Sequence, residues 1–264
     1  MDIFTDDRLP NSYAICLIGH GSRDPEGAQE FLNLTQKLRE RRLCPIVEPA
    51  FLEFVKPEIT EVLSSFQHNG IKNIIILPGI LFSGEHTQRD VPHTVNEVFR
   101  NLPEINLVFA EPLATQPKVI EACQKRIEEE EKYSKPFSRS ETLLMTIGHG
   151  SRYKGFNSEV QKNLSQLGEK MGFGKTLTGF AGSSQHYLED MQEKFTPQGF
   201  RRVILLPFFL FSGVWVKRVH SLADTFQSKY PDTEFLKAPC LSHHGLIIDA
   251  LIQSVRESVP SKLI

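Results

Sequence analysis

Hydrophobic residues in this chain occur in short, nearly continuous runs that alternate with longer amphipathic stretches. In the first half, runs rich in Ile, Leu and Val predict strands at 12–18, 46–52, 73–80 and 106–110. The stretches between them predict helices at 26–42, 57–69, 91–101 and 116–133. The second half repeats the order, with strands at 142–147, 176–181, 202–209 and 234–238. Apolar runs of this kind are typical of parallel strands covered on both faces.

This alternation predicts an α/β fold in which right-handed crossovers build a three-layer α/β/α sandwich around parallel-rich sheets. Two motifs show that the fold is duplicated. The sequence IGHGSR at 18–23 returns at 147–152, and LPGILFSG at 77–84 returns as LPFFLFSG at 206–213. Both pairs are offset by 129 positions. We therefore expect two tandem, pseudo-twofold-related Rossmann-like domains.

The polar stretch at 134–140 is the natural linker, so we expect domains at 1–135 and 141–264. The acidic run at 128–131 ends a helix before this linker and is expected to be solvated.

Composition narrows the class of protein. The 264 residues carry a net charge of −2, which argues against nucleic-acid binding. No apolar run reaches the roughly 18 residues that span a bilayer. The N-terminus lacks a signal-peptide pattern. The four cysteines are scattered without a C-x-x-C pair, which is typical of reduced thiols. A soluble, cytoplasmic protein is expected.

Three residues that can bind metals or protons follow successive strands of the first half. His20 follows the first strand, Glu53 the second and His86 the third, at intervals of 33 residues. Because the carboxyl ends of parallel strands form one edge of a sheet, we expect these three at a common ligand-binding edge. Imidazoles bind Fe²⁺, Co²⁺ and Ni²⁺, and His and Glu side chains also accept protons.

The second half has lost part of this set. His149 aligns with His20, but Gly182 aligns with Glu53 and Trp215 with His86. We therefore expect one active site per chain, in the first half, with Trp215 as an apolar wall or a core-covering aromatic. The alternative for the first half is structural: a loop histidine, a solvated carboxylate and an exposed histidine. The glycines beside His20 would permit close approach of a ligand.

The motifs GHGSR at 19–23, AFLE at 50–53, LFSGEH at 81–86 and DVP at 90–92 resemble those of class II chelatases. More narrowly, almost the whole chain resembles the two-domain sirohydrochlorin chelatases. The resemblance implies a chelatase-type fold and insertion of Fe²⁺ or Co²⁺ into the tetrapyrrole sirohydrochlorin. The metal would be a substrate, with no tightly bound cofactor. A monomer with an internal pseudo-dimer is expected, without a nucleic-acid or membrane partner.

The resemblance also implies roles for individual residues. His20 and His86 would receive the ion and take protons from pyrrole nitrogens, with Glu53 as proton acceptor and metal partner. Sirohydrochlorin carries carboxylates that need cations and N–H donors. Residues beside the reactive set are candidates for binding them: Ser22, Arg23, Ser83, Gly84, Gln88 and Arg89. A structural role for Arg23 within its own loop is equally consistent with the sequence.

Two further readings remain open at this point. The chain has no His-rich tract and no C-x-x-C pair, accessories of some cobalt-inserting relatives, which favours Fe²⁺ and sirohaem over Co²⁺ and cobalamin. A non-catalytic carrier of a metal or tetrapyrrole would use the same histidines for binding alone.

Overall fold

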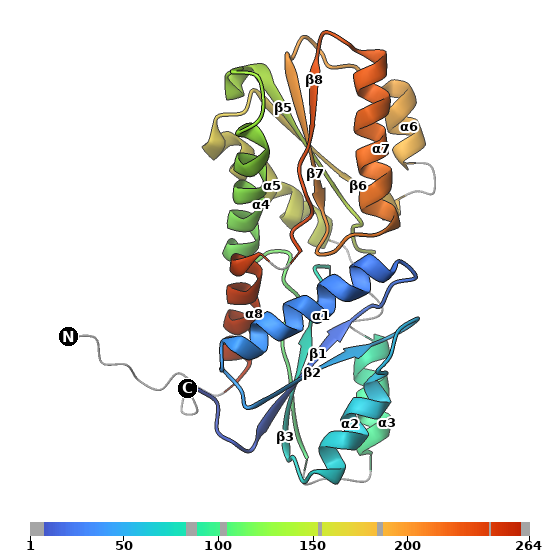
Figure 1. Cartoon of the computed structure of the whole chain (residues 1–264), viewed down its shortest axis with the longest axis vertical. Coiled ribbons are helices and arrows are strands. Elements are labelled where there is room, and N and C mark those ends of the chain that lie inside the picture. The colour runs from blue at the N-terminus through green and yellow to red at the C-terminus, as the bar shows by residue number, and fades with distance from the viewer. Residues whose placement is uncertain are drawn as a thin grey trace, which may run out of the picture. The chain divides into compact units, whose positions relative to one another are not determined.

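The structure, a computed structural model, describes residues 8–82, 89–100, 105–152, 155–183, 187–242 and 244–259. The chain forms two compact units (Figure 1). Unit 1 comprises Met1–Leu113 and Gly245–Ile264, and unit 2 comprises Ala114–His244.

Unit 1 is built on a four-stranded parallel sheet with the order β2-β1-β3-β4. Its strands are β1 (Tyr13–Gly19), β2 (Ile46–Phe51), β3 (Asn73–Pro78) and β4 (Asn106–Phe109). Figure 1 shows helices on both faces, with α1 (Pro25–Glu40) and α8 (Gly245–Ser258) on one and α2 (Ile59–His68) and α3 (Val91–Phe99) on the other. Unit 1 is thus a three-layer sandwich.

Unit 2 repeats this architecture with the strand order β6-β5-β7-β8. Its strands are β5 (Thr142–Gly148), β6 (Lys175–Phe180), β7 (Arg202–Phe208) and β8 (Glu234–Lys237). Helices α4 (Pro117–Glu131) and α5 (Phe156–Met171) cover one face, and α6 (Tyr187–Lys194) and α7 (Val214–Lys229) cover the other (Figure 1). Short 3-10 turns lie at Arg139–Glu141 and Ala181–Ser183.

The predicted two-domain α/β fold is confirmed, and every predicted strand is present within two residues of its expected ends. The strands could be predicted because buried strands have continuous apolar sequences, and all residues of β1, β5 and β7 are indeed buried. Pro92 lies in the first turn of α3, whereas the helix expected at 57–69 begins only at Ile59, after Pro57. Proline is tolerated at a first turn because the N–H there has no partner within the helix.

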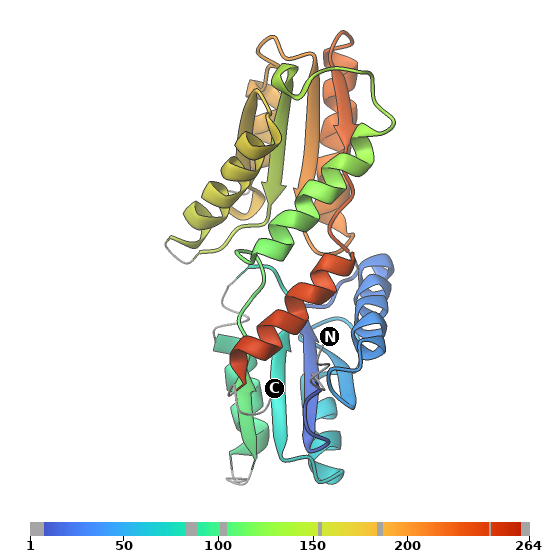
Figure 2. The same ribbon diagram turned by 90° about the vertical axis from the view of Figure 1, so that its left-hand side faces the viewer.

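The compact units are divided differently from the expected domains at 1–135 and 141–264. Helix α4 closes the first sequence repeat but packs on β7, β8 and α5 of unit 2. Helix α8 closes the second repeat but packs on α1 and β3 of unit 1, as Figure 2 shows for the red helix. Each unit therefore borrows its last helix from the other repeat. The alternation of strands and helices along a sequence does not encode which sheet a helix covers.

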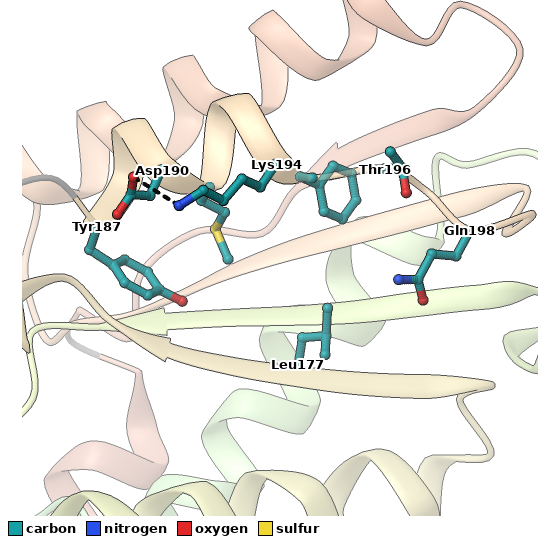
Figure 3. Close-up of a pocket in the computed structure, with 8 residues that line it drawn as sticks. Leu177, Tyr187, Asp190, Lys194, Thr196 and Gln198 are labelled. Atoms are coloured by element: carbon teal, nitrogen blue, oxygen red, sulfur yellow. Dashed lines mark hydrogen bonds and ion pairs between the residues drawn. The ribbon is translucent and has the colours of Figure 1, made fainter.

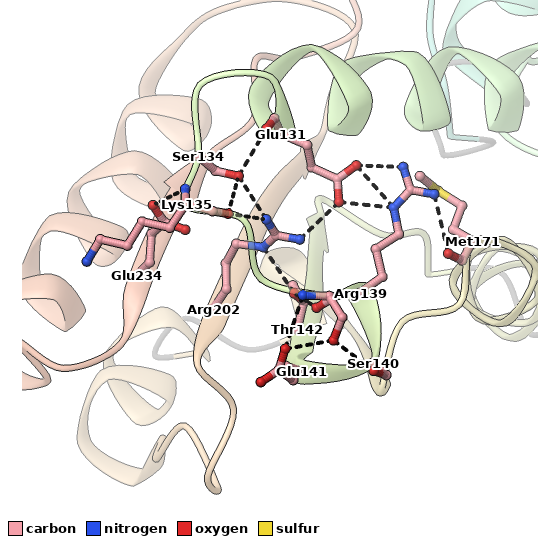
Figure 4. Close-up of polar contacts among 11 residues, drawn as sticks. Glu131, Ser134, Lys135, Arg139, Ser140, Glu141, Thr142, Met171, Arg202 and Glu234 are labelled. Carbon is pink, nitrogen blue, oxygen red and sulfur yellow. Dashed lines mark hydrogen bonds and ion pairs between the residues drawn. The ribbon is translucent and has the colours of Figure 1, made fainter.

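A network of charged side chains fastens the end of α4 inside unit 2 (Figure 4). The carboxylate of Glu131 accepts hydrogen bonds from Arg139, the shortest at 2.6 Å, and from Arg202 at 3.1 Å. Arg202 is only 3% exposed and also donates to Thr142 Oγ1 at 3.0 Å. The expectation that the acidic run at 128–131 is simply solvated is therefore wrong for Glu131. Its partners come from distant sequence positions, so no local pattern announced them.

Among the described residues, no helix is both long and apolar enough to cross a membrane.

Candidate functional site

The structure brings the backbones of His20 and Glu53 together at the carboxyl edge of the unit 1 sheet. Strand β1 ends at Gly19 and pairs in parallel with β2, which ends at Phe51. Beyond the strands, the amide of Leu52 donates to the carbonyl of Gly19, and the amide of Glu53 donates to the carbonyl of His20, each at 3.0 Å. The parallel ladder thus continues for two residues and holds both loops in register.

Gly21 makes this close approach possible. Its φ is +89°, a conformation that residues with a Cβ rarely adopt. A Cβ at this position would collide with the carbonyl oxygen of Glu53. On the other side of His20, a Cβ on Gly19 would lie 2.8 Å from the ring of Phe31. The flanking glycines were expected to admit a ligand, but the structure shows that each accommodates the protein's own chain.

Both candidate side chains of this pair are exposed. The ring of His20 lies with Nδ1 3.4 Å from the carbonyl oxygen of Gly21. A solvent-facing imidazole and a solvent-facing carboxylate on adjoining loops can ligate a divalent ion weakly or accept protons from a bound molecule. Within the described parts of the chain, no group of three or more His, Cys, Asp or Glu residues is placed to hold a metal ion.

The third predicted member of the set, His86, lies outside the described residues, together with the candidate binding residues Ser83, Gly84 and Gln88. The structure therefore tests neither the triad as a whole nor this part of the predicted binding surface.

The floor of the site is aromatic. Phe31 from α1 is buried and packs on Phe51 at 4.9 Å between ring centroids. A Cβ on Gly79 would lie 2.7 Å from the Phe31 ring, which explains glycine in the first LPG motif. In the second repeat, Val160 takes the place of Phe31 and Phe208 that of Gly79, and both are fully buried. The smaller side chain at the first of these positions is thus matched by a larger one at the second, as expected for a close-packed core.

Three of the predicted binding residues are described. The hydroxyl oxygen of Ser22 accepts a hydrogen bond from the amide of Asp24 at 3.0 Å, which shapes the start of α1. Arg89 is exposed and forms an ion pair with Asp90 at 3.2 Å. The guanidinium of Arg23 lies over the ring of Phe54, 4.9 Å from its centroid. Sequence reasoning missed Phe54, because its one signal is adjacency to Glu53.

The helix starts near this edge already carry their own carboxylates. Asp24 caps α1 by accepting from the amide of Glu26 at 3.2 Å. At α2, Glu58 and Glu61 form a reciprocal capping box. A carboxylate at a helix N-terminus offsets the partial positive charge there. These side chains therefore reduce the attraction of both helix starts for an anionic ligand.

Unit 2 keeps the loop geometry but has different residues at two of the three candidate positions. The amide of Gly182 donates to the carbonyl of His149 at 2.7 Å, just as Glu53 does to His20. The ring of Trp215 lies 5.7 Å from that of His149, centroid to centroid, and it is half-buried on the core. The guanidinium of Arg218 also lies over the Trp215 ring, 4.8 Å from its centroid. A lone imidazole beside an indole cannot supply a carboxylate ligand or a second titrating group.

A separate pocket of about 390 Å³ lies between α6 and β6 of unit 2 (Figure 3). Leu177, Met191 and Phe195 make it largely apolar, and an ion pair of Asp190 and Lys194 borders it. Tyr187 also lines it, and burial raises the pKa of its hydroxyl. The pocket contains none of the predicted site residues.

Comparison with known proteins places these features in a family. The CbiX family model matches the chain twice, over residues 14–130 and 143–258. The sirohydrochlorin cobaltochelatase of Priestia megaterium is 25% identical over 252 residues, covering 95% of this chain and 81% of the relative. The sirohydrochlorin ferrochelatase of the same organism is 22% identical over 249 residues, covering 94% and 91%.

Among solved structures, the sirohydrochlorin chelatase SirB from Bacillus subtilis subspecies spizizenii, in complex with cobalt, shares the fold. Its TM-score is 0.76 at 18% identity, over 93% of this chain and 94% of that chain. The family model itself covers most of the chain and matches both repeats. The chain therefore belongs to the CbiX family, and the predicted relationship to the sirohydrochlorin chelatases is confirmed at the level of the family.

Proposed function

We propose that this protein is a sirohydrochlorin chelatase, an enzyme that inserts a divalent metal ion into the tetrapyrrole sirohydrochlorin. The observation that carries the proposal is the hydrogen bond from the Glu53 amide to the His20 carbonyl, which places an exposed imidazole and an exposed carboxylate on adjoining loops of one sheet edge. Family membership and the names of the relatives from Priestia megaterium support this assignment.

The reaction requires two proton acceptors. A divalent ion replaces the two N–H protons of the macrocycle, so two protons leave for each ion that enters. His20 accepts one proton at Nε2, because its Nδ1 faces the carbonyl oxygen of Gly21, and Glu53 accepts the other at a carboxylate oxygen. The same lone pairs bind the arriving ion before transfer. An incomplete ligand set suits this role, because a closed set of four protein ligands would retain the metal.

We include His86 in the proposed site on the strength of the repeat. Trp215 occupies the matching position of unit 2, where its ring lies beside that of His149. His86 is the residue of the first repeat that aligns with Trp215, and we propose that it supplies a second imidazole for the ion. Gly182 and Trp215 offer no such groups, so we propose that unit 2 carries no second insertion site.

For the metal we propose Fe²⁺. The chain lacks the His-rich tract and the C-x-x-C pair that accompany some cobalt-inserting proteins. Its relatives include both a cobaltochelatase and a ferrochelatase at similar identity, so the direct comparison of Fe²⁺ with Co²⁺ is the deciding experiment.

The test is anaerobic chelation with substoichiometric protein, followed by the absorbance of sirohydrochlorin, with Fe²⁺ and Co²⁺ in parallel. We expect many turnovers for the parent. Losing one general acid–base group lowers a rate by about 100-fold or more, so His20→Ala and Glu53→Gln should each fall by at least that factor. His149→Ala is the matched control and should stay near the parent rate.

Three outcomes would contradict the proposal. Product formation that stops at one equivalent per chain would indicate a carrier rather than an enzyme. Full activity of His20→Ala with an inactive His149→Ala would place the chemistry in unit 2. Faster turnover with Co²⁺ than with Fe²⁺ would overturn the metal assignment while leaving the chelatase assignment intact.

A further inference from the structure

Phe54 has an unusual combination of properties for a large apolar residue. Its side chain is 55% exposed. It is also held at a φ of +65°, in the left-handed region that residues with a Cβ rarely adopt. A hydrogen bond of 2.8 Å from the amide of Val55 to the carbonyl of Glu53 closes a tight turn around it. Folding gains little from this arrangement, because the ring is not buried and the backbone is strained.

The position of Phe54 links it to the candidate site. It directly follows Glu53, whose amide donates a hydrogen bond to the carbonyl of His20. Strained, exposed residues concentrate at functional sites, where the surrounding structure holds them in place. Within the described part of unit 1, Phe54 is a large aromatic residue that is exposed to solvent and adjoins the candidate reactive pair His20 and Glu53.

Arg23 provides a positive charge next to Phe54, since its guanidinium lies over the Phe54 ring, 4.9 Å from the centroid. A guanidinium that interacts with a ring through its flat face keeps its N–H donors in its own plane, directed outward. Those donors can bind a carboxylate in the fork geometry that guanidinium and carboxylate share. One pair of side chains thus offers both an apolar ring and a cation beside the site.

We propose that Phe54 and Arg23 form a substrate-binding pair, in which the Phe54 ring contacts the face of the conjugated macrocycle and Arg23 binds one of its peripheral carboxylates. The inference rests on the proposed function, since it assigns two residues to the recognition of sirohydrochlorin. Phe54 acts in binding and orientation and takes no part in proton transfer. A polycarboxylated, flat, conjugated ring is the ligand class that matches this pair.

The test separates binding from chemistry and from folding. Sirohydrochlorin is titrated into metal-free protein, and KM and kcat are measured by chelation, for the parent, Phe54→Gly, Phe54→Tyr and Arg23→Gln. Phe54→Gly should raise Kd and KM about tenfold, a loss typical of one aromatic contact. Its kcat should stay within about twofold, and its Tm should not fall, because glycine relieves the positive φ. Phe54→Tyr, which keeps the ring and the strain, should bind as the parent does.

Salt distinguishes the two members of the pair. Between about 0.05 M and 0.5 M KCl, the advantage of the parent over Arg23→Gln should shrink, because screening weakens an exposed ion pair. The advantage of the parent over Phe54→Gly should persist. Arg42→Gly is the control for backbone relief, since Arg42 also has a positive φ, of +54°, but follows the far end of α1. It should leave Kd and KM unchanged.

An unchanged Kd and KM in Phe54→Gly would overturn the inference. A fall in kcat with unchanged Kd would do so as well, because it would show that the turn only positions Glu53. Failure of the proposed function looks different: the parent itself would then neither bind sirohydrochlorin nor turn it over.

Discussion

Replacing Gly21 by alanine tests whether the backbone contact between the His20 and Glu53 loops sets the activity. Two costs arise. The first is the positive φ of +89°, which an alanine tolerates at a cost of about 1 kcal/mol. The second is steric, because the carbonyl oxygen of Glu53 occupies the place of the new methyl group. That oxygen must retreat by about 1 Å or more to reach the 3.0 Å below which real Cβ contacts essentially never occur.

The two costs predict different readouts. Overpacking typically costs about 1 to 3 kcal/mol, so the unfolding free energy of Gly21→Ala should fall by about 2 to 4 kcal/mol in total. Displacing a catalytic group by about 1 Å can lower a rate by about 100-fold, and we expect this loss in kcat/KM. The measurements are urea denaturation followed by far-ultraviolet circular dichroism and anaerobic chelation of the folded variant.

Gly70 provides the matched control, since its φ is +71° and a Cβ there would meet no atom within 4 Å. Gly70→Ala should therefore lose only the backbone cost of about 1 kcal/mol and keep its activity. If Gly21→Ala proves no less stable and no less active than Gly70→Ala, the contact between the two loops does not govern the site, and our reasoning from geometry fails.

Three further predictions concern the framework. Glu131→Ala leaves the buried charge of Arg202 with one partner fewer, so it should lower the unfolding free energy by about 3 to 5 kcal/mol. The control Glu189→Ala breaks an exposed ion pair and should lower the unfolding free energy by less than about 1 kcal/mol; urea denaturation of both variants measures the difference. Burial raises the pKa of the Cys44 thiol to about 11, so a thiol reagent at neutral pH should modify it only after unfolding; rapid labelling of the native chain at Cys44, mapped by mass spectrometry, would contradict this. Hydrogen bonds from Gln124, the larger contribution, and from Lys125 hold the pKa of Glu128 below its usual 4.5. The stabilisation from ionised Glu128 is therefore complete above that pH and is lost as the pH falls through the lower pKa of the folded state. Glu128→Gln should flatten the fall of the unfolding free energy at acid pH, and an unchanged fall would refute the assignment.

Local patterns were enough for the elements and for the pairing of His20 with Glu53. Continuous apolar runs mark strands that are buried on both faces, and the parallel register then fixes which residues meet at the carboxyl edge. The repeat added the asymmetry between the units, because Gly182 and Trp215 stand at positions that can be aligned without a structure. Both inferences depend on short-range periodicity or on sequence identity.

Other features depend on contacts between distant positions. The sequence does not reveal that Gly21 makes room for a carbonyl 32 residues later, or that the first LPG motif needs its glycine because of Phe31. Nor does it reveal that Glu131 leaves its acidic run to bind Arg202, 71 positions away. A side chain's partner is chosen by the packing of the whole unit, so its own sequence neighbourhood carries no signal of it.

The sequence by itself determined the duplicated α/β architecture, the sheet edge that His20 and Glu53 share, and the repeat in which this pair occurs. Those properties follow from the period of buried positions and from parallel pairing, which act over a few residues at a time. The tertiary structure alone decided that helices α4 and α8 exchange places between the repeats and that Phe54 stands exposed beside Glu53 with Arg23 on its face. An amphipathic helix can bury its apolar face on any matching sheet, and an exposed ring gives no hydrophobic pattern to read.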